Sequence, residues 1–175
     1  RTISAHKGTH TQAPNFAYPL SVRKFKEWLR RNPKADLDLD LSSLRHMINA
    51  AEPVDAMAIV DFYDTFKQYK LPEDVVIPTF GLAEHCVFVC SDGKQVLMVD
   101  KAELALHRVH VLESRPTMRE YSTFVKQSLG GLEDFAGTQV IVGCGYPHKG
   151  DRVDVRIVEP ESRQLLDDGG SAEWA

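Results

Sequence analysis

The alternation of apolar and polar positions predicts a largely helical chain, beginning with residues 21–31 (SVRKFKEWLRR). Four apolar side chains in this run share one helical face: Val22, Phe25, Trp28 and Leu29. Basic side chains cover the remaining surface: Arg23, Lys24, Lys26, Arg30 and Arg31. Ser21 is expected to cap this helix and Pro33 to end it. The helix could lie on an anionic membrane surface, but we favour one that packs its aromatic side chains onto the body of the protein.

Residues 41–70 repeat this helical period twice. Leucine, methionine and isoleucine recur at helical spacing over residues 41–51, and Glu52-Pro53 then interrupts the pattern. A second apolar row follows: Ala58, Phe62, Phe66 and Tyr69. This second helix is expected to end before Pro72, because the residue that precedes a proline disfavours helical geometry. The two segments together predict a pair of short antiparallel helices.

A similar layout returns at residues 117–140. Thr117 and Glu120 form a capping box, Gly130-Gly131 supplies a turn, and residues 132–140 begin another apolar helix. The two pairs also have nearly the same length. The interval from Leu41 to Val75 is 34 residues, and that from Met118 to Val153 is 35 residues. A constant period of this size indicates a helical repeat.

Local patterns in the second half of the chain favour strands instead. In residues 85–101, β-branched runs flank Ser91-Asp92-Gly93, which is typical of a β-hairpin. Residues 108–112 and 138–142 are also rich in strand-forming side chains. We therefore predict an all-α fold, a short array of helical hairpins with extended termini, and keep an α+β fold with a helical N-terminal half as the alternative. The predicted division is a basic arm (1–20), a helical repeat domain (21–152) and a C-terminal extension (153–175).

Charge is distributed unevenly along the chain. Residues 1–35 contain eight Lys or Arg and one acid, whereas the whole chain has a net charge of −4. The acidic remainder disfavours RNA as a partner, because affinity for nucleic acid comes from cations that neutralise phosphates. A basic arm on an acidic body indicates docking onto an oppositely charged surface. No apolar run reaches the roughly 18 residues that a membrane span requires, so we predict no transmembrane segment.

The candidate reactive side chains do not form a recognised site. A zinc site could be drawn from Cys86, Cys90, Cys144 and His148, but the usual close cysteine pairs are absent. Cys144 and His148 could also form a nucleophilic pair, yet no orienting acid stands out. Residues 143–151 (GCGYPHKGD) lack the spacing of a phosphate-binding loop. We predict no catalytic residue, no cofactor and no metal. An α+β enzyme with Cys144 as its nucleophile is the remaining enzymatic hypothesis.

The two helix pairs resemble a known repeat family. Residues 41–76 (LSSLRHMINAAEPVDAMAIVDFYDTFKQYKLPEDVV) resemble a pentatricopeptide repeat, and residues 118–135 (MREYSTFVKQSLGGLEDF) are similar to the start of another. With its short, acidic chain and an acid-free start typical of a processed organellar protein, the sequence resembles the extra pentatricopeptide-type subunit of the mitochondrial F1-ATPase of some protists.

This resemblance implies a non-catalytic structural subunit in the mitochondrial matrix or on the matrix face of the inner membrane. Its implied site is the outside of the F1 head of ATP synthase, with the F1 α subunit as the favoured partner. An organellar RNA-binding protein or mitoribosome accessory is the alternative. Tryptophan and arginine are enriched where binding energy concentrates. The residues expected to contact the partner are Arg23, Lys24, Lys26, Trp28, Arg30, Arg31 and Trp174.

Overall fold

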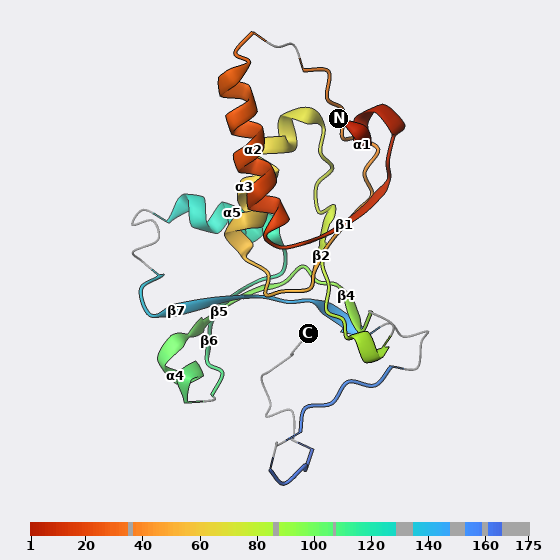
Figure 1. Ribbon diagram of the computed structural model, residues 1–175. Helices are drawn as coiled ribbons and strands as arrows, with labels where there is room; N and C mark the ends of the chain where they lie inside the picture. Colours follow the sequence, from red (N-terminus) through yellow and green to blue (C-terminus); the bar gives the residue numbers. More distant parts are fainter. Residues whose placement is uncertain are drawn as a thin grey trace.

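The computed structural model has an α+β fold, and its helices and strands alternate along the chain (Figure 1). The all-α prediction is therefore wrong and the alternative class is the observed one, although the N-terminal half contains a parallel sheet. The described residues are 1–34, 37–85, 88–106, 108–128, 135–147, 153–158 and 161–165. Within these ranges, no helix combines the length and the hydropathy that crossing a bilayer requires.

A three-stranded parallel sheet organises the first half. Its strands, in spatial order, are β1 (His10–Pro14), β2 (His46–Ala50) and β3 (Val76–Pro78). The helical elements of this half are α1 (Thr2–His6), α2 (Ala17–Arg31), α3 (Ala56–Phe66) and a 3-10 turn, η1 (Lys67–Tyr69). α2 connects β1 to β2 and α3 connects β2 to β3, as parallel pairing requires a crossover between neighbouring strands.

Strand β2 replaces the helix that we predicted over residues 41–51. Met47 and Asn49 are buried, whereas the neighbours on either side of each are exposed or half-buried, which is the two-residue period of a strand. Apolar residues in this segment fit a helical period as well, but β2 lies between β1 and β3 and forms ladders with both. This pairing outweighs the local pattern.

The second half contains two further small sheets. β5 (Val96–Asp100) lies between β6 (Val111–Arg115) and β7 (Thr138–Val142), antiparallel to both. β4 (Cys90–Asp92) pairs with β8 (Gly145–Pro147). Within the described residues, the remaining helices are η2 (Ala83–His85), α4 (Lys101–Ala105) and α5 (Met118–Gln127). The predicted hairpin at residues 85–101 is thus wrong in its pairing, because β4 and β5 bond to different partners.

Strand β7 overlaps residues 132–140, where the last helix was predicted to begin. Residues 138–142 pair with β5, and this overturns the second helix pair and the repeat that it implied. The predicted turn at Gly130-Gly131 lies outside the described residues. A fold built on three sheets cannot be a stack of helical hairpins.

Three of the predicted helices are confirmed. The helix predicted at residues 21–31 is the later part of α2, which begins at Ala17 without a side-chain cap; the Ser21 hydroxyl donates to the Ala17 carbonyl instead. α3 is capped by the Asp55 side chain, and the helical segment ends before Pro72. At α5, Thr117 Oγ1 accepts from the Glu120 backbone N–H, so the N-cap half of the predicted capping box is present, while Glu120 Oε1 accepts from the Thr117 hydroxyl.

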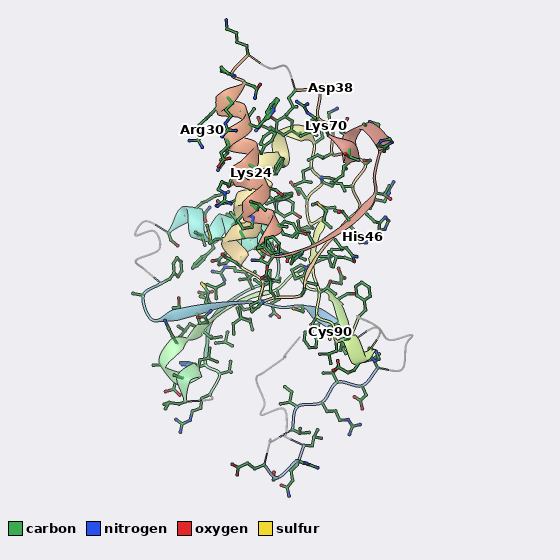
Figure 2. All side chains as sticks on the ribbon, in the orientation of Figure 1. Lys24, Arg30, Asp38, His46, Lys70 and Cys90 are labelled. Carbon is green, nitrogen blue, oxygen red and sulfur yellow. The ribbon has the colours of Figure 1, made fainter. Side chains whose placement is uncertain are left out.

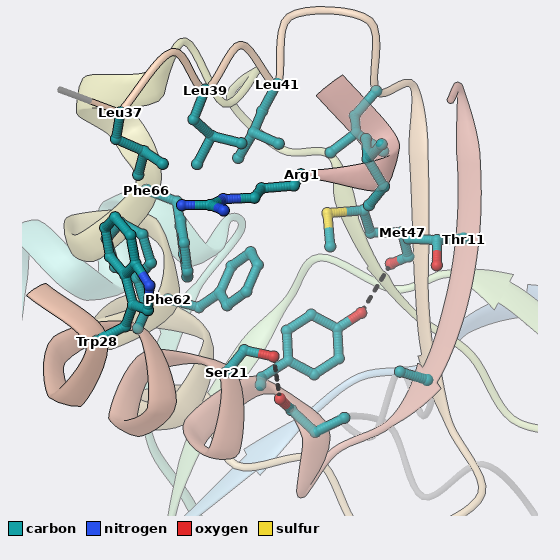
Figure 3. Close-up of a pocket in the computed structure, with 16 residues that line it drawn as sticks. Arg1, Thr11, Ser21, Trp28, Leu37, Leu39, Leu41, Met47, Phe62 and Phe66 are labelled. Atoms are coloured by element: carbon teal, nitrogen blue, oxygen red, sulfur yellow. Dashed lines mark hydrogen bonds between the residues drawn. The ribbon is translucent and has the colours of Figure 1, made fainter. Parts of the chain in front are cut away.

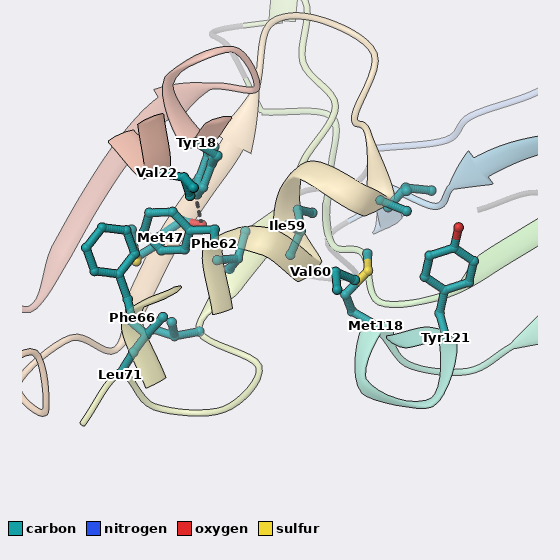
Figure 4. Close-up of a cluster of buried hydrophobic side chains, with 14 of the residues drawn as sticks. Tyr18, Val22, Met47, Ile59, Val60, Phe62, Phe66, Leu71, Met118 and Tyr121 are labelled. Atoms are coloured by element: carbon teal, nitrogen blue, oxygen red, sulfur yellow. Dashed lines mark hydrogen bonds between the residues drawn. The ribbon is translucent and has the colours of Figure 1, made fainter. Parts of the chain in front are cut away.

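The core lies between the parallel sheet and its helices. Phe25 of α2 packs on Phe66 of α3 with ring centroids 4.9 Å apart, and Tyr18 meets Phe62 edge-on at 5.1 Å. Figure 4 shows α3 in the middle of this cluster, with Tyr18 and Val22 on one side and Met118 of α5 on the other. α3 therefore connects the helix layer of the parallel sheet to the second half of the chain.

Candidate functional site

The carboxyl ends of β1, β2 and β3 meet at one edge, because the three strands are parallel. Ligands of open α/β sheets bind outside this edge, in the loops that follow the strands. Here those loops are residues 15–16, 51–55 and 79–82. We define the carboxyl-edge site by the polar residues of these loops and strand ends: Asn15, Asn49, Glu52, Asp55 and Thr79.

Hydrogen bonds tie the three loops together. The Asn49 side-chain amide donates to Asn15 Oδ1 at 3.1 Å, and the Asp55 backbone N–H donates to the same oxygen at 3.2 Å. The Thr79 backbone N–H donates to the Asn49 carbonyl at 3.0 Å. Asn49 therefore contacts the loop on either side of its own strand. Its position at the centre of the edge makes it the organising residue of the site.

The loop after β2 is held in an unusual backbone conformation. Ala51 has a φ of 72°, in the left-handed region that side chains other than glycine rarely adopt. Glu52 follows it and accepts a hydrogen bond from the Phe16 backbone N–H through Oε1. Strained residues of this kind concentrate at binding and catalytic sites, where the surrounding structure holds them in place.

Asn49 also has an unused acceptor. Its side chain is fully buried, and its Oδ1 accepts no hydrogen bond from any described residue. A buried polar group that lacks a partner costs about 1–3 kcal/mol, so such groups are rare in native proteins. The Asn49 side-chain Oδ1 is therefore an unpartnered acceptor, buried beneath the loops of the carboxyl edge.

Large apolar side chains are exposed at the same edge. Phe16 follows β1 and is 57% exposed, and Phe80 and Leu82 follow β3 and are each 46% exposed. Apolar patches on a protein surface often mark ligand-binding grooves. The carboxyl edge thus combines flat apolar groups with a fixed set of amide and hydroxyl groups, which suits a ligand with an aromatic ring and a polar rim.

An apolar cavity of about 410 Å³ lies between α2, α3 and the adjacent face of β1 and β2 (Figure 3). This volume is in the range of small-molecule pockets, ~300–1,000 Å³. Its lining includes Ala13, Ala17, Tyr18, Trp28, Leu37, Leu39, Leu41, Met47, Phe62 and Phe66. Ala17 and Tyr18 directly follow Phe16, and Ala13 precedes Asn15 by two residues, so the cavity begins beside the carboxyl-edge site.

Tyr18 lines the cavity and anchors α2 to the sheet. Its hydroxyl donates to the carbonyls of Met47 and Ile48, at 3.3 and 3.1 Å, and so anchors the first turn of α2 on β2. Burial, together with the nearby Tyr63, raises the pKa of Tyr18 well above its usual range. The side chain therefore stays neutral and keeps its proton for these hydrogen bonds.

The structure separates the residues that the sequence grouped as partner contacts. Arg23, Lys24, Lys26, Arg30 and Arg31 are all exposed on α2. Trp28 turns inward and lines the cavity, with the Arg1 guanidinium 4.9 Å from its ring centroid. Trp174 lies outside the described residues.

Cys144 does not have the environment of a nucleophile. Burial raises the pKa of its thiol, and the neighbouring Cys90 raises it further, so the reactive thiolate is disfavoured. Cys86 and His148, the other residues of the zinc site weighed above, lie outside the described residues. In the described part of the chain, no group of three or more His, Cys, Asp or Glu could hold a metal ion.

Sequence reasoning missed the carboxyl-edge site because it assigned residues 46–50 to a helix. The available signal was the transition from an apolar run to polar and breaker residues at Asn49 and at Glu52-Pro53. A similar transition occurs at Pro78-Thr79, where an apolar run also ends at a polar residue. Two such transitions, each at the carboxyl end of a strand, are typical of a ligand-binding edge.

Comparison with known proteins finds that this chain is similar to segments of ligases. No family model matches the chain. Over 162 residues, or 91% of its length, it is 31% identical to the medium-chain-fatty-acid–[acyl-carrier-protein] ligase JamA of Moorena producens. Over 127 residues it is 35% identical to a putative ligase, Rv1013, of Mycobacterium tuberculosis. The chain spans about a quarter of these relatives, 24% and 22% of their respective lengths.

Solved structures agree with this relationship. The fatty acid AMP ligase of Legionella pneumophila superposes with a TM-score of 0.69 at 27% identity, over 95% of this chain and 25% of that one. A fatty acyl-adenylate ligase from the same organism, solved with acyl adenylate and pyrophosphate, gives a TM-score of 0.68. The chain therefore has the fold of one segment of an adenylate-forming ligase.

These findings overturn the predicted identity. The relatives are fatty-acyl AMP ligases and not pentatricopeptide-repeat proteins, so the resemblance to an F1-ATPase subunit is wrong. The relatives are enzymes, whereas we predicted a non-catalytic subunit. Nothing supports the F1 α subunit as a partner or a role in RNA binding. The mitochondrial location, the partner-contact residues and the division at residues 20 and 152 stay predictions.

Proposed function

We propose that this chain forms part of an acyl-adenylate-forming ligase, which activates a fatty acid with ATP. The observation that carries the proposal is the carboxyl-edge site with its adjoining apolar cavity, in a chain similar to JamA over 91% of its length. The structure of the Legionella ligase with acyl adenylate and pyrophosphate supports the same chemistry.

The proposed reaction joins the fatty acid to the nucleotide. A carboxylate oxygen of the fatty acid attacks the α-phosphorus of ATP and forms a new oxygen–phosphorus bond. The bond from this phosphorus to the oxygen that bridges to the β-phosphate breaks, and pyrophosphate leaves with the electron pair. The product is a mixed anhydride, the acyl adenylate, whose acyl carbon is activated for transfer to an acceptor.

The residues of the carboxyl edge suit the nucleotide half of this product. The exposed rings of Phe16 and Phe80 offer apolar surfaces for the adenine ring. Asn49 is fully buried beneath this edge, and its amide holds Asn15, which in turn accepts from the Asp55 backbone N–H. The hydrogen bonds from Asn49 to Asn15 and from Thr79 to Asn49 hold these groups in place before the ligand arrives, which reduces the entropy lost on binding.

The apolar cavity suits the acyl half of the acyl adenylate. Leu37, Leu39 and Phe62 are among the side chains that line it, and Tyr18, which also lines it, is held by hydrogen bonds from its hydroxyl to carbonyls of β2. An aliphatic chain enters such a space favourably because burial of each CH₂ stabilises binding by about 0.8 kcal/mol. The acyl carbon would then lie at the mouth, beside Asn15 and the start of α2.

A chimera tests the proposal directly. The quarter of the Legionella enzyme that matches this chain is replaced by residues 1–175, and fatty-acid-dependent exchange of pyrophosphate into ATP is measured. We expect exchange, with a loss of at least 10-fold when Asn49 is changed to Ala. A folded chimera that shows no exchange would contradict the proposal.

Because Asn49→Ala could disturb folding, a second measurement uses the 175-residue chain alone. A non-hydrolysable acyl-adenylate analogue should raise its thermal midpoint, and the free fatty acid should raise it less. No change in the midpoint with the analogue would also count against the proposal.

A further inference from the structure

The outer side of α2 carries an unpaired positive surface in a chain whose net charge is −4. α2 contains five cations and one carboxylate, Glu27. Lys24 lies 3.5 Å from Glu27, but Arg23, Lys26 and Arg30 have no carboxylate within ion-pairing distance among the described residues. Figure 2 shows Arg30 pointing away from the body of the protein. We call Arg23, Lys26 and Arg30 the basic face of α2.

The inner side of α2 fixes the direction of this basic face. Tyr18 and Val22 are buried, and Phe25 packs on Phe66 and Tyr69 with ring centroids 4.9 and 5.4 Å apart. The helix therefore cannot rotate to bury its cations. Charged side chains are almost never buried without a partner, so the basic face lies on the surface of this chain and is open to a partner of opposite charge.

A hollow of about 640 Å³ opens within the basic face. Its lining combines the three cations with Pro19, Val22, Leu29 and Asp61. The rim of three cations and one carboxylate keeps a net positive charge around the apolar atoms, which matches a protein partner that presents one apolar side chain among several carboxylates. Such a buried anchor with a charged rim is the usual anatomy of a specific interface.

A lipid surface fits these observations less well. A helix that lies on a membrane inserts its apolar face below the headgroups. The apolar face of α2 is already occupied by α3 and the sheet, through Tyr18, Val22 and Phe25. The part of α2 that is left exposed is a positively charged surface with one apolar hollow. This arrangement favours a protein with an acidic face.

We propose that the basic face of α2 docks an acidic face of the acyl carrier protein that receives the activated acyl group; this inference rests on the proposed function. JamA, the relative that matches 91% of this chain, is a ligase for an acyl carrier protein. In the transfer, the carrier's thiol sulfur bonds to the acyl carbon and the bond from that carbon to the adenylate oxygen breaks. AMP leaves with the electron pair, and the thiol proton passes to solvent.

Charge reversal on the basic face tests this docking. The variant Arg23→Glu, Lys26→Glu, Arg30→Glu is compared with a control of equal charge change, Lys34→Glu, Arg45→Glu, Lys101→Glu, whose positions are exposed and lie outside α2. Binding of the fluorescently labelled carrier protein of the Moorena producens ligase to the 175-residue chain is measured at low salt and at ~0.5 M salt, where exposed charges are screened. Far-UV circular dichroism confirms that each variant is folded. If the reversal variant is unfolded, the Gln triple at the same positions replaces it.

The expected results distinguish docking of the carrier protein from formation of the adenylate. The basic-face variant should bind at least 10-fold more weakly than the control, and high salt should weaken binding by the wild-type chain. Equal binding by the two variants, or no binding by the wild-type chain, would overturn the inference. Binding to anionic phosphatidylglycerol vesicles without binding to the carrier protein would do the same. Because this assay needs no adenylate formation, its failure is distinct from a failure of pyrophosphate exchange in the chimera.

Discussion

The side chains of Asn49 and Asn15 meet at the carboxyl edge of the parallel sheet, with the Asn49 amide nitrogen 3.1 Å from Asn15 Oδ1. The same Asn15 oxygen accepts from the Asp55 backbone N–H, which belongs to the N-terminal cap of α3. One oxygen thus aligns the start of α2, the end of β2 and the start of α3. This arrangement makes the geometry of the site sensitive to a single short side chain.

Changing Asn15 to Ala should impair both stability and function. The substitution removes the acceptor of two donors, one of them on the fully buried Asn49, and we expect a loss of about 1–3 kcal/mol in the free energy of unfolding. In the chimera, pyrophosphate exchange should fall by at least 10-fold at a temperature where the variant is folded. The control is Asn32→Ala: its side chain donates to the Trp28 carbonyl at an exposed helix end, so both quantities should change little. Equal losses for the two variants would contradict the role of Asn15.

Tyr63 should make stability depend on alkaline pH. Its hydroxyl accepts from the Val76 backbone N–H at 2.8 Å, joining α3 to β3. Burial and then the nearby Asp74 and Glu73 raise the pKa of Tyr63 to about 12, although the hydrogen bond from Val76 lowers it. Because the folded pKa lies above the unfolded value of 10.0, the neutral form stabilises the fold fully below pH 10, and this contribution is lost as the pH rises through about 12.

The variant Tyr63→Phe tests this dependence in urea unfolding experiments between neutral and alkaline pH. We expect a loss of about 1–3 kcal/mol at pH 7, because the Val76 N–H loses its acceptor. Above pH 10 the variant should lose stability less steeply than the wild type, which still has Tyr63 to ionise. An unchanged slope above pH 10 would show that Tyr63 does not titrate in this way.

Alanine substitutions at two glycines distinguish the cost of backbone strain from the cost of a steric clash. Gly145 and Gly137 have φ values of 83° and 88°, so alanine is strained at either position. A Cβ at Gly145 would collide with the Ser91 carbonyl of the paired strand, whereas a Cβ at Gly137 meets nothing within 4 Å. Gly137→Ala should therefore cost about 1 kcal/mol and Gly145→Ala clearly more, because β4 and β8 must move apart. Unfolding by urea measures both, and equal costs would show that β4 and β8 adjust freely.

The sequence alone predicts the helices whose positions depend on local side-chain patterns. α2, α3 and α5 have continuous amphipathic patterns, and for α5 the signal includes the N-cap Thr117, which caps the helix in the structure. The exposed cations of α2 were placed correctly for the same reason. Strands β1 and β2 have no comparable local signal, because His10–Pro14 is largely polar and His46–Ala50 fits a helical period as well. Their conformation depends on pairing between segments 36 residues apart.

The candidate site could not be predicted for a related physical reason. It exists only where the ends of three parallel strands converge, and Asn15, Asn49 and Thr79 are distant in the sequence. The burial of Asn49 follows from its place in the central strand, which no local property of an asparagine indicates. Knowing that residues 46–50 form a strand would have been enough to direct attention to this edge.

Filling the cavity should change which fatty acids are accepted. Ala13 lines the cavity from β1, two residues before Asn15, and the cavity of about 410 Å³ has room for a larger side chain. Ala13→Leu should shorten the space for the acyl chain, so kcat/KM for the longest accepted acid should fall by about 10-fold, while that for the shortest is nearly unchanged. Gln12→Leu is the control, because it places a leucine on the exposed, opposite face of β1. Pyrophosphate exchange across a series of chain lengths measures the effect in the chimera. A loss that is uniform over all chain lengths would show that the acyl chain lies elsewhere.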